Sequence, residues 1–274
     1  MIPVAFEYER VSSADAALAL LAQHGDDAKL LAGGHSLLPL MKLRFATPSV
    51  LIDVGRVTEL SYINDAGDHI AIGALTRHHD LQHSDLLKSQ ATILAHAAGQ
   101  VGDQQVRHRG TIGGSIAHGD PASDLPAVVL ALGGSMVIRG QSGERTVAAG
   151  DFFTGFLETA LGADELLTEI RVPKVPGAGW SFQKLTKRAQ DWAIVGAAVV
   201  KNGTTGIGLV NMGPTPVRAT AAEQALAGGA SLADAAAVAD QGQSPSADIN
   251  ASEEFRRHLA RVLVRRGLEE ATSR

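Results

Sequence analysis

Short apolar runs separated by polar turns fill the first 55 residues and predict a strand–helix–strand unit. Ser12 and Asp15 have the spacing of a capping box, and leucines recur behind them, which predicts a helix that ends at about Gln23. The largely apolar runs Lys29–Ala32 and Val50–Val54 are typical of buried strands. The order of these segments indicates a small unit that mixes helix and sheet.

Between residues 60 and 172 the pattern changes to pairs of alternating segments, each pair flanking a turn that contains glycine. Ser61–Asn64 and His69–Gly73 form the first pair, and Gly133–Arg139 and Glu144–Val147 form the second, so we expect two β-hairpins. Leu86–Gly99 is predicted to be one helix between them. Hairpins interspersed with helices predict an α+β fold.

Two prolines and two glycines within Val172–Gly179 mark the predicted domain boundary, because these residue types interrupt both helices and strands. The chain beyond this boundary predicts strands at Trp180–Leu185, Ala193–Lys201 and Thr205–Met212, then helices near residues 219–227, 231–240 and 252–271. We expect a first domain over residues 1–175, with lobes of about 1–55 and 56–175. A second domain, with antiparallel strands and a helical end, is expected over residues 176–274.

Two motifs contain a Gly-Gly pair followed by serine. The first, AGGHS at residues 32–36, comes after a predicted strand and before a helical stretch that begins at Ser36. The second, TIGGS at residues 111–115, comes before HGDPASDLP. Each motif read alone is a tight turn with glycines at positive φ. Their repetition beside apolar runs favours a shared ligand.

Glycine lets the backbone approach a ligand closely, and successive N–H groups then form a nest that binds anions. Ser36 and Thr111 add hydroxyl donors, and each charge-assisted bond contributes about 1.5–3 kcal/mol. Two such motifs suit two adjacent anionic groups. Neither motif is the G-x-G-x-x-G of a Rossmann unit or a P-loop, so we expect a dinucleotide held by a different architecture.

Two carboxylates follow the second motif, Asp120 and Asp124. A carboxylate repels a diphosphate, so we expect these side chains to face sugar or ribityl hydroxyls and to accept hydrogen bonds from them. The alternative is a helix start, because Asp120-Pro121 and Ser123-Asp124-Leu125-Pro126 also have the composition of helix N-termini. The residues alone leave both interpretations open.

Composition narrows the classes of function. The chain has 274 residues, a net charge of −5 and no cysteine. The charge gives no footprint for nucleic acid, and the missing cysteines exclude a disulfide and disfavour an iron–sulfur cluster on this chain. We expect no metal site and no catalytic triad. The N-terminus lacks the pattern of a signal peptide and no run is long enough to span a membrane, so a cytoplasmic protein is expected.

Together, AGGHSLLPLMKLR and RGTIGGSIAHGDPASDLPA resemble the FAD-binding medium subunits of molybdenum hydroxylases. GDQQVRHRGTIGG, ADELLTEIRVP, KRAQDWAIVGAA and the C-terminal DINASEEFRRHLARVLVRRGLEEA extend this resemblance over essentially the whole chain. The length and the opening FEYERVSSADAALALL look most like the medium subunits of aerobic carbon monoxide dehydrogenases. The resemblance implies a vanillyl-alcohol-oxidase (PCMH) type FAD domain in two lobes and a small C-terminal α+β domain.

The resemblance also implies a set of FAD-binding residues. The diphosphate loops would be Ala32, Gly33, Gly34, His35 and Ser36, with Leu37 beside them, and Thr111, Ile112, Gly113, Gly114 and Ser115. Asp124 would lie near the ribityl chain, and Leu166 and Lys184 would flank the flavin or adenine. Asp191 and Trp192 fall near the isoalloxazine of relatives, although a core tryptophan on a strand is the alternative for Trp192.

The resemblance also implies how the steps of the reaction are distributed among subunits, and therefore the function of this chain. Substrate would be oxidised at a molybdenum cofactor on a large subunit, and a small subunit would pass electrons through [2Fe–2S] clusters to FAD on this chain. FAD would hand them to an external acceptor, in a dimer of heterotrimers that reaches the inner face of the membrane only through a partner. Carbon monoxide is the expected substrate, and nicotine, a purine, an aldehyde or another aromatic compound is the alternative. A self-contained flavin oxidase and a scaffold without flavin are the other hypotheses.

Overall fold

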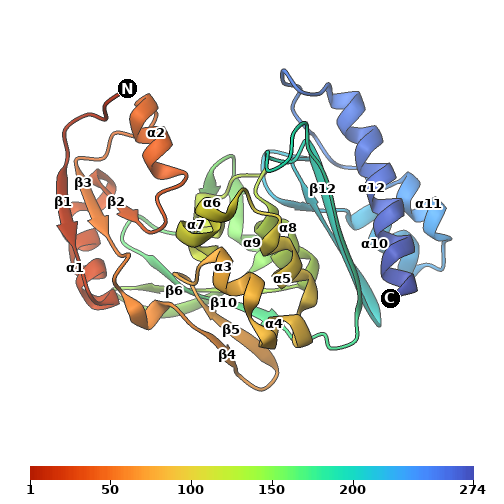
Figure 1. Cartoon of the computed structure of the whole chain (residues 1–274), viewed down its shortest axis with the longest axis horizontal. Coiled ribbons are helices and arrows are strands. Elements are labelled where there is room, and N and C mark those ends of the chain that lie inside the picture. Colours follow the sequence, from red (N-terminus) through yellow and green to blue (C-terminus); the bar gives the residue numbers. More distant parts are fainter.

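The computed structural model describes all 274 residues, and three larger sheets follow one another in chain order (Figure 1). The first is a parallel sheet with the order β1-β3-β2. Its strands are β1 (Glu7–Arg10), β2 (Ala28–Leu31) and β3 (Val50–Asp53), accompanied by α1 (Ala14–His24), the 3-10 turn η1 (Gly25–Asp27) and α2 (Leu37–Leu43). Both predicted strands of this unit are confirmed; β3 is buried as expected, whereas in β2 only Ala28 is fully buried.

The start of α1 differs from the predicted capping box by one residue. Ser13, not Ser12, is the N-cap, and its Oγ accepts a hydrogen bond from the Ala16 N–H. The acid of the predicted box, Asp15, instead forms an ion pair with Arg139 on the middle sheet. The helix was therefore predicted correctly, and the reciprocal bond of the box is replaced by a tertiary contact.

The middle sheet is antiparallel, with the order β4-β5-β10-β6-β7. Its strands are β4 (Ile63–Asp65), β5 (His69–Gly73), β6 (Ser135–Gly140), β7 (Gly143–Ala148) and β10 (Leu166–Pro173), and η2 (Thr58–Leu60) leads into it. Both predicted hairpins are confirmed, and β10 inserts between them. A small ladder of β8 (Phe153–Gly155) and β9 (Glu158–Thr159) lies at its margin.

Seven helices accompany the middle sheet. They are α3 (His78–His83), α4 (Asp85–Gln90), α5 (Thr92–Gly99), α6 (Gln104–Arg109), α7 (Ile112–His118), α8 (Asp124–Leu132) and α9 (Ala149–Phe152). The prediction of a single helix over Leu86–Gly99 was wrong, because Ala91 leaves the helical region with φ −150° and ψ 57°. Its side chain is fully buried, so the turn lets α4 and α5 both pack on one core.

The last sheet is antiparallel, with the order β11-β12-β13-β14. It contains β11 (Gly179–Leu185), β12 (Val195–Asn202), β13 (Thr204–Val210) and β14 (Val217–Arg218), followed by α10 (Thr220–Ala227), α11 (Leu232–Ala237) and α12 (Glu253–Ser273). The three predicted strands and the predicted helices are confirmed, and the α+β class with them. No helix of the structure is both long enough and apolar enough to cross a membrane.

Glycines allow two helices to pack on the last sheet at backbone distance. Gly206 and Gly208 on β13 face the carbonyl oxygens of Ala131 and Ala127 on α8, and a Cβ at either glycine would overlap them. Gly179 on β11 faces the Ala271 carbonyl of α12 in the same way. The sheet thus connects α8, from the middle of the chain, to the C-terminal helix.

Candidate functional site

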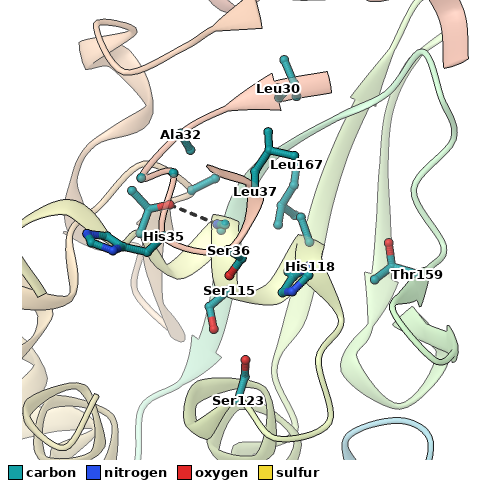
Figure 2. Close-up of a pocket in the computed structure, with 18 of the residues that line it drawn as sticks. Leu30, Ala32, His35, Ser36, Leu37, Ser115, His118, Ser123, Thr159 and Leu167 are labelled. Carbon is teal, nitrogen blue, oxygen red and sulfur yellow. Dashed lines mark hydrogen bonds between the residues drawn. The ribbon is translucent and has the colours of Figure 1, made fainter. Parts of the chain in front are cut away.

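A cleft of about 800 Å³ runs between the first lobe, the N-terminal end of α7 and β11. Both glycine motifs lie on its wall, together with Asp124, Lys184 and Trp192. Figure 2 shows the hydroxyl groups of Ser36, Ser115 and Ser123 directed into the same space. Segments that are far apart in the sequence therefore meet in one cavity, whose volume lies in the range of cofactor sites.

The first motif forms the turn from β2 into α2. The backbone N–H groups of residues 33–37 donate no hydrogen bond within the chain. Gly34 has φ 81°, a conformation that side chains with a Cβ rarely adopt. Ser36 is the N-cap of α2 but makes no capping hydrogen bond, so its hydroxyl is also free. This turn offers consecutive unpaired donors, as the anion-nest prediction requires.

The second motif differs from the predicted loop, because it is the N-cap and first turn of α7. The Ile112 N–H donates to Thr76 O at 3.0 Å, the Gly113 N–H to Ala74 O at 2.8 Å and the Gly114 N–H to Thr111 Oγ1 at 3.1 Å. Gly113 is also a packing requirement, since a Cβ there would lie 2.5 Å from the Ala74 Cβ. The predicted set of free N–H donors is therefore absent from this motif.

The first motif touches the segment just before the second motif at backbone distance. A Cβ on Gly33 would lie 2.5 Å from Arg109 O and 2.8 Å from Gly110 Cα, so only glycine permits this approach. Arg77, just before α3, donates from Nη1 to the same Arg109 carbonyl. Gly33 thus allows the first motif to pack against the segment that leads into the second motif, and Arg77 binds this same segment.

A buried ion pair lies deeper in the cleft. Asp124 is the first residue of α8 and is 6% exposed, and its Oδ2 lies 2.7 Å from Lys184 Nζ on β11. Lys184 also donates to Gln100 O at 3.1 Å. The other carboxylate oxygen, Asp124 Oδ1, is buried and has no partner. Burial raises the pKa of Asp124 to about 6, against the opposing charge of Lys184.

Trp192 lies in the connection between β11 and β12, at the edge of the cleft. Its side chain is 59% exposed, so the interpretation as a core tryptophan on a strand is wrong. Asp191 precedes it on the cleft wall, and the end of the connection is held firmly. Asn211 Nδ2 donates to Ala193 O at 3.0 Å, and the buried Arg256 of α12 donates to Ile194 O.

The other predicted residues divide between the cleft and the core. Ala32, His35, Leu37, Ser115 and Leu166 line the cleft. The Ile112 side chain is fully buried in the core beneath the motif. Asp120 is not on the cleft wall, and its Oδ1 accepts from the Ala122 N–H at 2.8 Å in a local turn. Asp124 begins α8, as the helix-start interpretation expects, but its side chain makes no capping bond and accepts from Lys184 instead.

Several residues that line the cleft were not predicted from the sequence to bind a ligand. They are His78, His118, Ser123, Leu157, Thr159 and Gln190. Ser123 and His118 flank Asp120 in the HGDPASD segment, so their position beside the motif was the one available indication. Thr159 and Leu157 come from the small β8–β9 ladder, which no periodicity marks.

Comparison with known proteins identifies the family. Residues 4–175 match the model described as FAD binding domain in molybdopterin dehydrogenase, and residues 180–271 match CO dehydrogenase flavoprotein C-terminal domain. The chain is 44% identical to the carbon monoxide dehydrogenase medium chain of Hydrogenophaga pseudoflava, over 100% of this chain and 99% of that one. It is 39% identical to caffeine dehydrogenase subunit beta of a Pseudomonas species, over 83% and 80%.

A solved structure gives the same assignment. Carbon monoxide dehydrogenase from Hydrogenophaga pseudoflava, in a form that lacks the Mo-pyranopterin moiety, contains a chain with a TM-score of 0.96 and 45% identity. The alignment covers 100% of this chain and 99% of that chain. The protein therefore belongs to the FAD-binding subunits of the molybdopterin dehydrogenase family and carries the C-terminal domain of carbon monoxide dehydrogenase flavoproteins.

Proposed function

We propose that this chain is the FAD-carrying medium subunit of an aerobic carbon monoxide dehydrogenase. The full-length similarity to medium chains of that enzyme carries the proposal. Bound FAD would accept electrons from [2Fe–2S] clusters and pass them to an external acceptor, which is chemistry that the cofactor supplies. This chain has no cysteine for such clusters, so the clusters and the molybdenum cofactor would belong to a small and a large partner subunit.

The residues present fit a dinucleotide. The free N–H groups of residues 33–37 suit a diphosphate, which is anionic and accepts hydrogen bonds. The unpartnered Asp124 Oδ1 suits a donor, and the ribityl and ribose hydroxyls of FAD are donors. A buried acceptor without a partner costs about 1–3 kcal/mol, which a hydroxyl from the cofactor would recover.

Each part of the cleft would then contact a different part of FAD. Gly33, Gly34, His35 and Ser36 would hold the diphosphate from one side, and Ser115 would approach it from α7. Lys184 would fix the orientation of Asp124 toward a sugar or ribityl hydroxyl. Leu166 would pack against a ring of the cofactor, and Asp191 and Trp192 would border the isoalloxazine. Ile112 would contribute only the packing that supports the motif.

The assembly follows from the family in the same way. We propose a dimer of heterotrimers in which residues 1–175 form the FAD domain and residues 176–274 the C-terminal domain. The location would be the cytoplasm, with attachment to the inner face of the membrane only through a partner.

Other substrates remain as alternatives because the oxidising centre would lie on another chain. The similarity to a caffeine dehydrogenase subunit favours a purine as the second candidate. A self-contained flavin oxidase is a third candidate, and it differs from the others in needing no partner.

Anaerobic reduction of the flavin tests these alternatives. The complex that purifies with the tagged chain is mixed with carbon monoxide, and separate samples receive caffeine or nicotine, while the flavin absorption band is followed. Bleaching by carbon monoxide in the complex, but not in the isolated chain, supports the proposal. Bleaching by another compound alone would assign a different hydroxylase, and catalytic reduction of the isolated chain would overturn the subunit function.

A further inference from the structure

His78 is a buried polar residue of the cleft that none of these roles uses. It is the first residue of α3, its side chain is 5% exposed, and it lines the cleft. Its backbone N–H donates to Gly110 O at 3.0 Å and its ring lies against Gly110, the residue that precedes the second motif. A buried polar side chain is normally paired, so an unpaired one on a cleft wall points to a ligand.

Neither nitrogen of the ring has a hydrogen-bond partner within the chain. Nδ1 is completely enclosed, so contact with the cleft is left to the Cδ2–Nε2 edge. That edge lies against Gly110, where a Cβ would come within 2.6 Å of Cδ2 and 2.8 Å of Nε2. Only glycine at position 110 therefore leaves room for this edge of the ring, and Nε2, unlike Nδ1, is not fully enclosed.

The surroundings of the ring favour an anion. His35 from the first motif, Arg77 before α3 and Arg107 on α6 are the charged or titratable groups that act on it. Burial and these neighbours lower the pKa of His78 to about 4, so the ring is neutral at pH 7 and carries one N–H. The same positively charged groups would attract an anionic ligand.

We propose that the Nε2–H group of His78 binds the anionic diphosphate of the dinucleotide. The proposal rests on FAD binding in this cleft, as proposed above. It also accounts for the second motif, whose backbone N–H groups at Ile112, Gly113 and Gly114 are already paired within the chain. The diphosphate would thus receive backbone donors from the first motif and a side-chain donor from beside the second.

Two substitutions separate this role from packing. His78→Gln places an amide donor where Nε2 lies, whereas His78→Leu keeps the bulk and removes the donor. His79→Leu on the same helix is the matched control, because His79 does not line the cleft. Each variant is prepared as the full chain with its co-purifying subunits and stripped of flavin. FAD and riboflavin, which has no phosphate, are then titrated separately.

We expect His78→Leu to weaken FAD roughly 10- to 100-fold, the loss of one hydrogen bond to a charged group. His78→Gln should stay near wild type, and riboflavin should bind all variants equally. A bound anion raises the pKa of a histidine, so wild type should take up more protons on binding FAD than His78→Gln, as measured by calorimetry in buffers of different ionisation enthalpy.

Three outcomes would contradict the proposed role of His78 or the proposed function. Equal FAD affinity in wild type and His78→Leu would overturn the inference while leaving the FAD site intact. Equal losses for FAD and riboflavin in His78→Leu would assign the residue to packing and also overturn it. Failure of the wild-type complex to bind FAD would instead refute the proposed function itself.

Discussion

Asp124 and Lys184 form an ion pair of 2.7 Å in the interior of the cleft, although 60 residues separate them in the chain. Asp124 begins a helix that packs on the last sheet, and Lys184 lies on a strand of that sheet. One carboxylate oxygen is used by the lysine and the other is unpartnered. The pair therefore leaves one carboxylate oxygen of a cleft-lining residue without a partner.

Asp124→Asn should weaken FAD by about 1–3 kcal/mol, because the amide replaces a charged acceptor of a hydroxyl by a neutral group. Titration of flavin-free protein with FAD measures the effect. Asp120→Asn is the control, since Asp120 lies off the cleft wall. Equal losses in both variants would contradict the assigned role of Asp124.

Asp124 should stabilise the flavin-free protein at low pH, and this contribution should be lost as the pH rises from about 4 to 7. The pKa of Asp124 is raised from 3.8 to about 6 in the folded state, so folding binds a proton between these values. This contribution is full below pH 4 and is lost as the pH passes 6, a change of roughly 2–3 kcal/mol. Other groups titrate as well, so the measurement is the difference between wild type and Asp124→Asn in denaturant unfolding at each pH. A constant difference across this range would disprove the prediction.

Gly33→Ala should abolish most flavin retention, because a Cβ would lie 2.5 Å from Arg109 O and force the two motifs apart. Gly34→Ala should reduce retention through strain at φ 81°, of the order of 1–2 kcal/mol. Gly67→Ala is the matched control, since it has φ 97° but open space around it. The measurement is flavin per chain after gel filtration, and full retention in Gly33→Ala would refute the two-motif site.

Trp192 should report flavin binding by its fluorescence. The chain has two tryptophans, and Trp192 borders the cleft whereas Trp180 contacts His96 and Arg274 elsewhere. Flavin absorbs in the range where tryptophan emits, so FAD should quench Trp192 strongly. Trp192→Phe should remove most of the quenching and Trp180→Phe should keep it. The reverse pattern would place the flavin away from Trp192.

The sequence predicted elements well where a local pattern decides them. The strands at Val50–Asp53 and Thr204–Val210 are short, apolar and bounded by turns, and both were expected. The break at Ala91 was not expected, because Leu86–Gly99 has unbroken helical composition and the turn depends on burial against other helices. Tertiary packing thus overrode local preference there.

In the cleft, too, features set by a local pattern could be predicted and features set by tertiary packing could not. The motif at residues 32–36 could be recognised because its glycines and free donors belong to one continuous segment. The pairing of the Ile112 and Gly113 N–H groups could not be predicted, because their acceptors belong to Ala74 and Thr76, which are distant in the sequence. His78 could not be recognised from the sequence, because its burial and missing partner are properties of the fold.

The contact of Gly206 and Gly208 with α8 determines how this protein can be dissected. A chain cut in the linker near residue 176 would keep every glycine of both motifs, yet α8 would lose the sheet against which its Ala127 and Ala131 carbonyls fit. Lys184 would be removed with the same fragment, and the buried Asp124 carboxylate would lose its ion-pair partner. A minimal flavin module made by truncation at this linker would therefore lack contacts on which α8 and Asp124 depend.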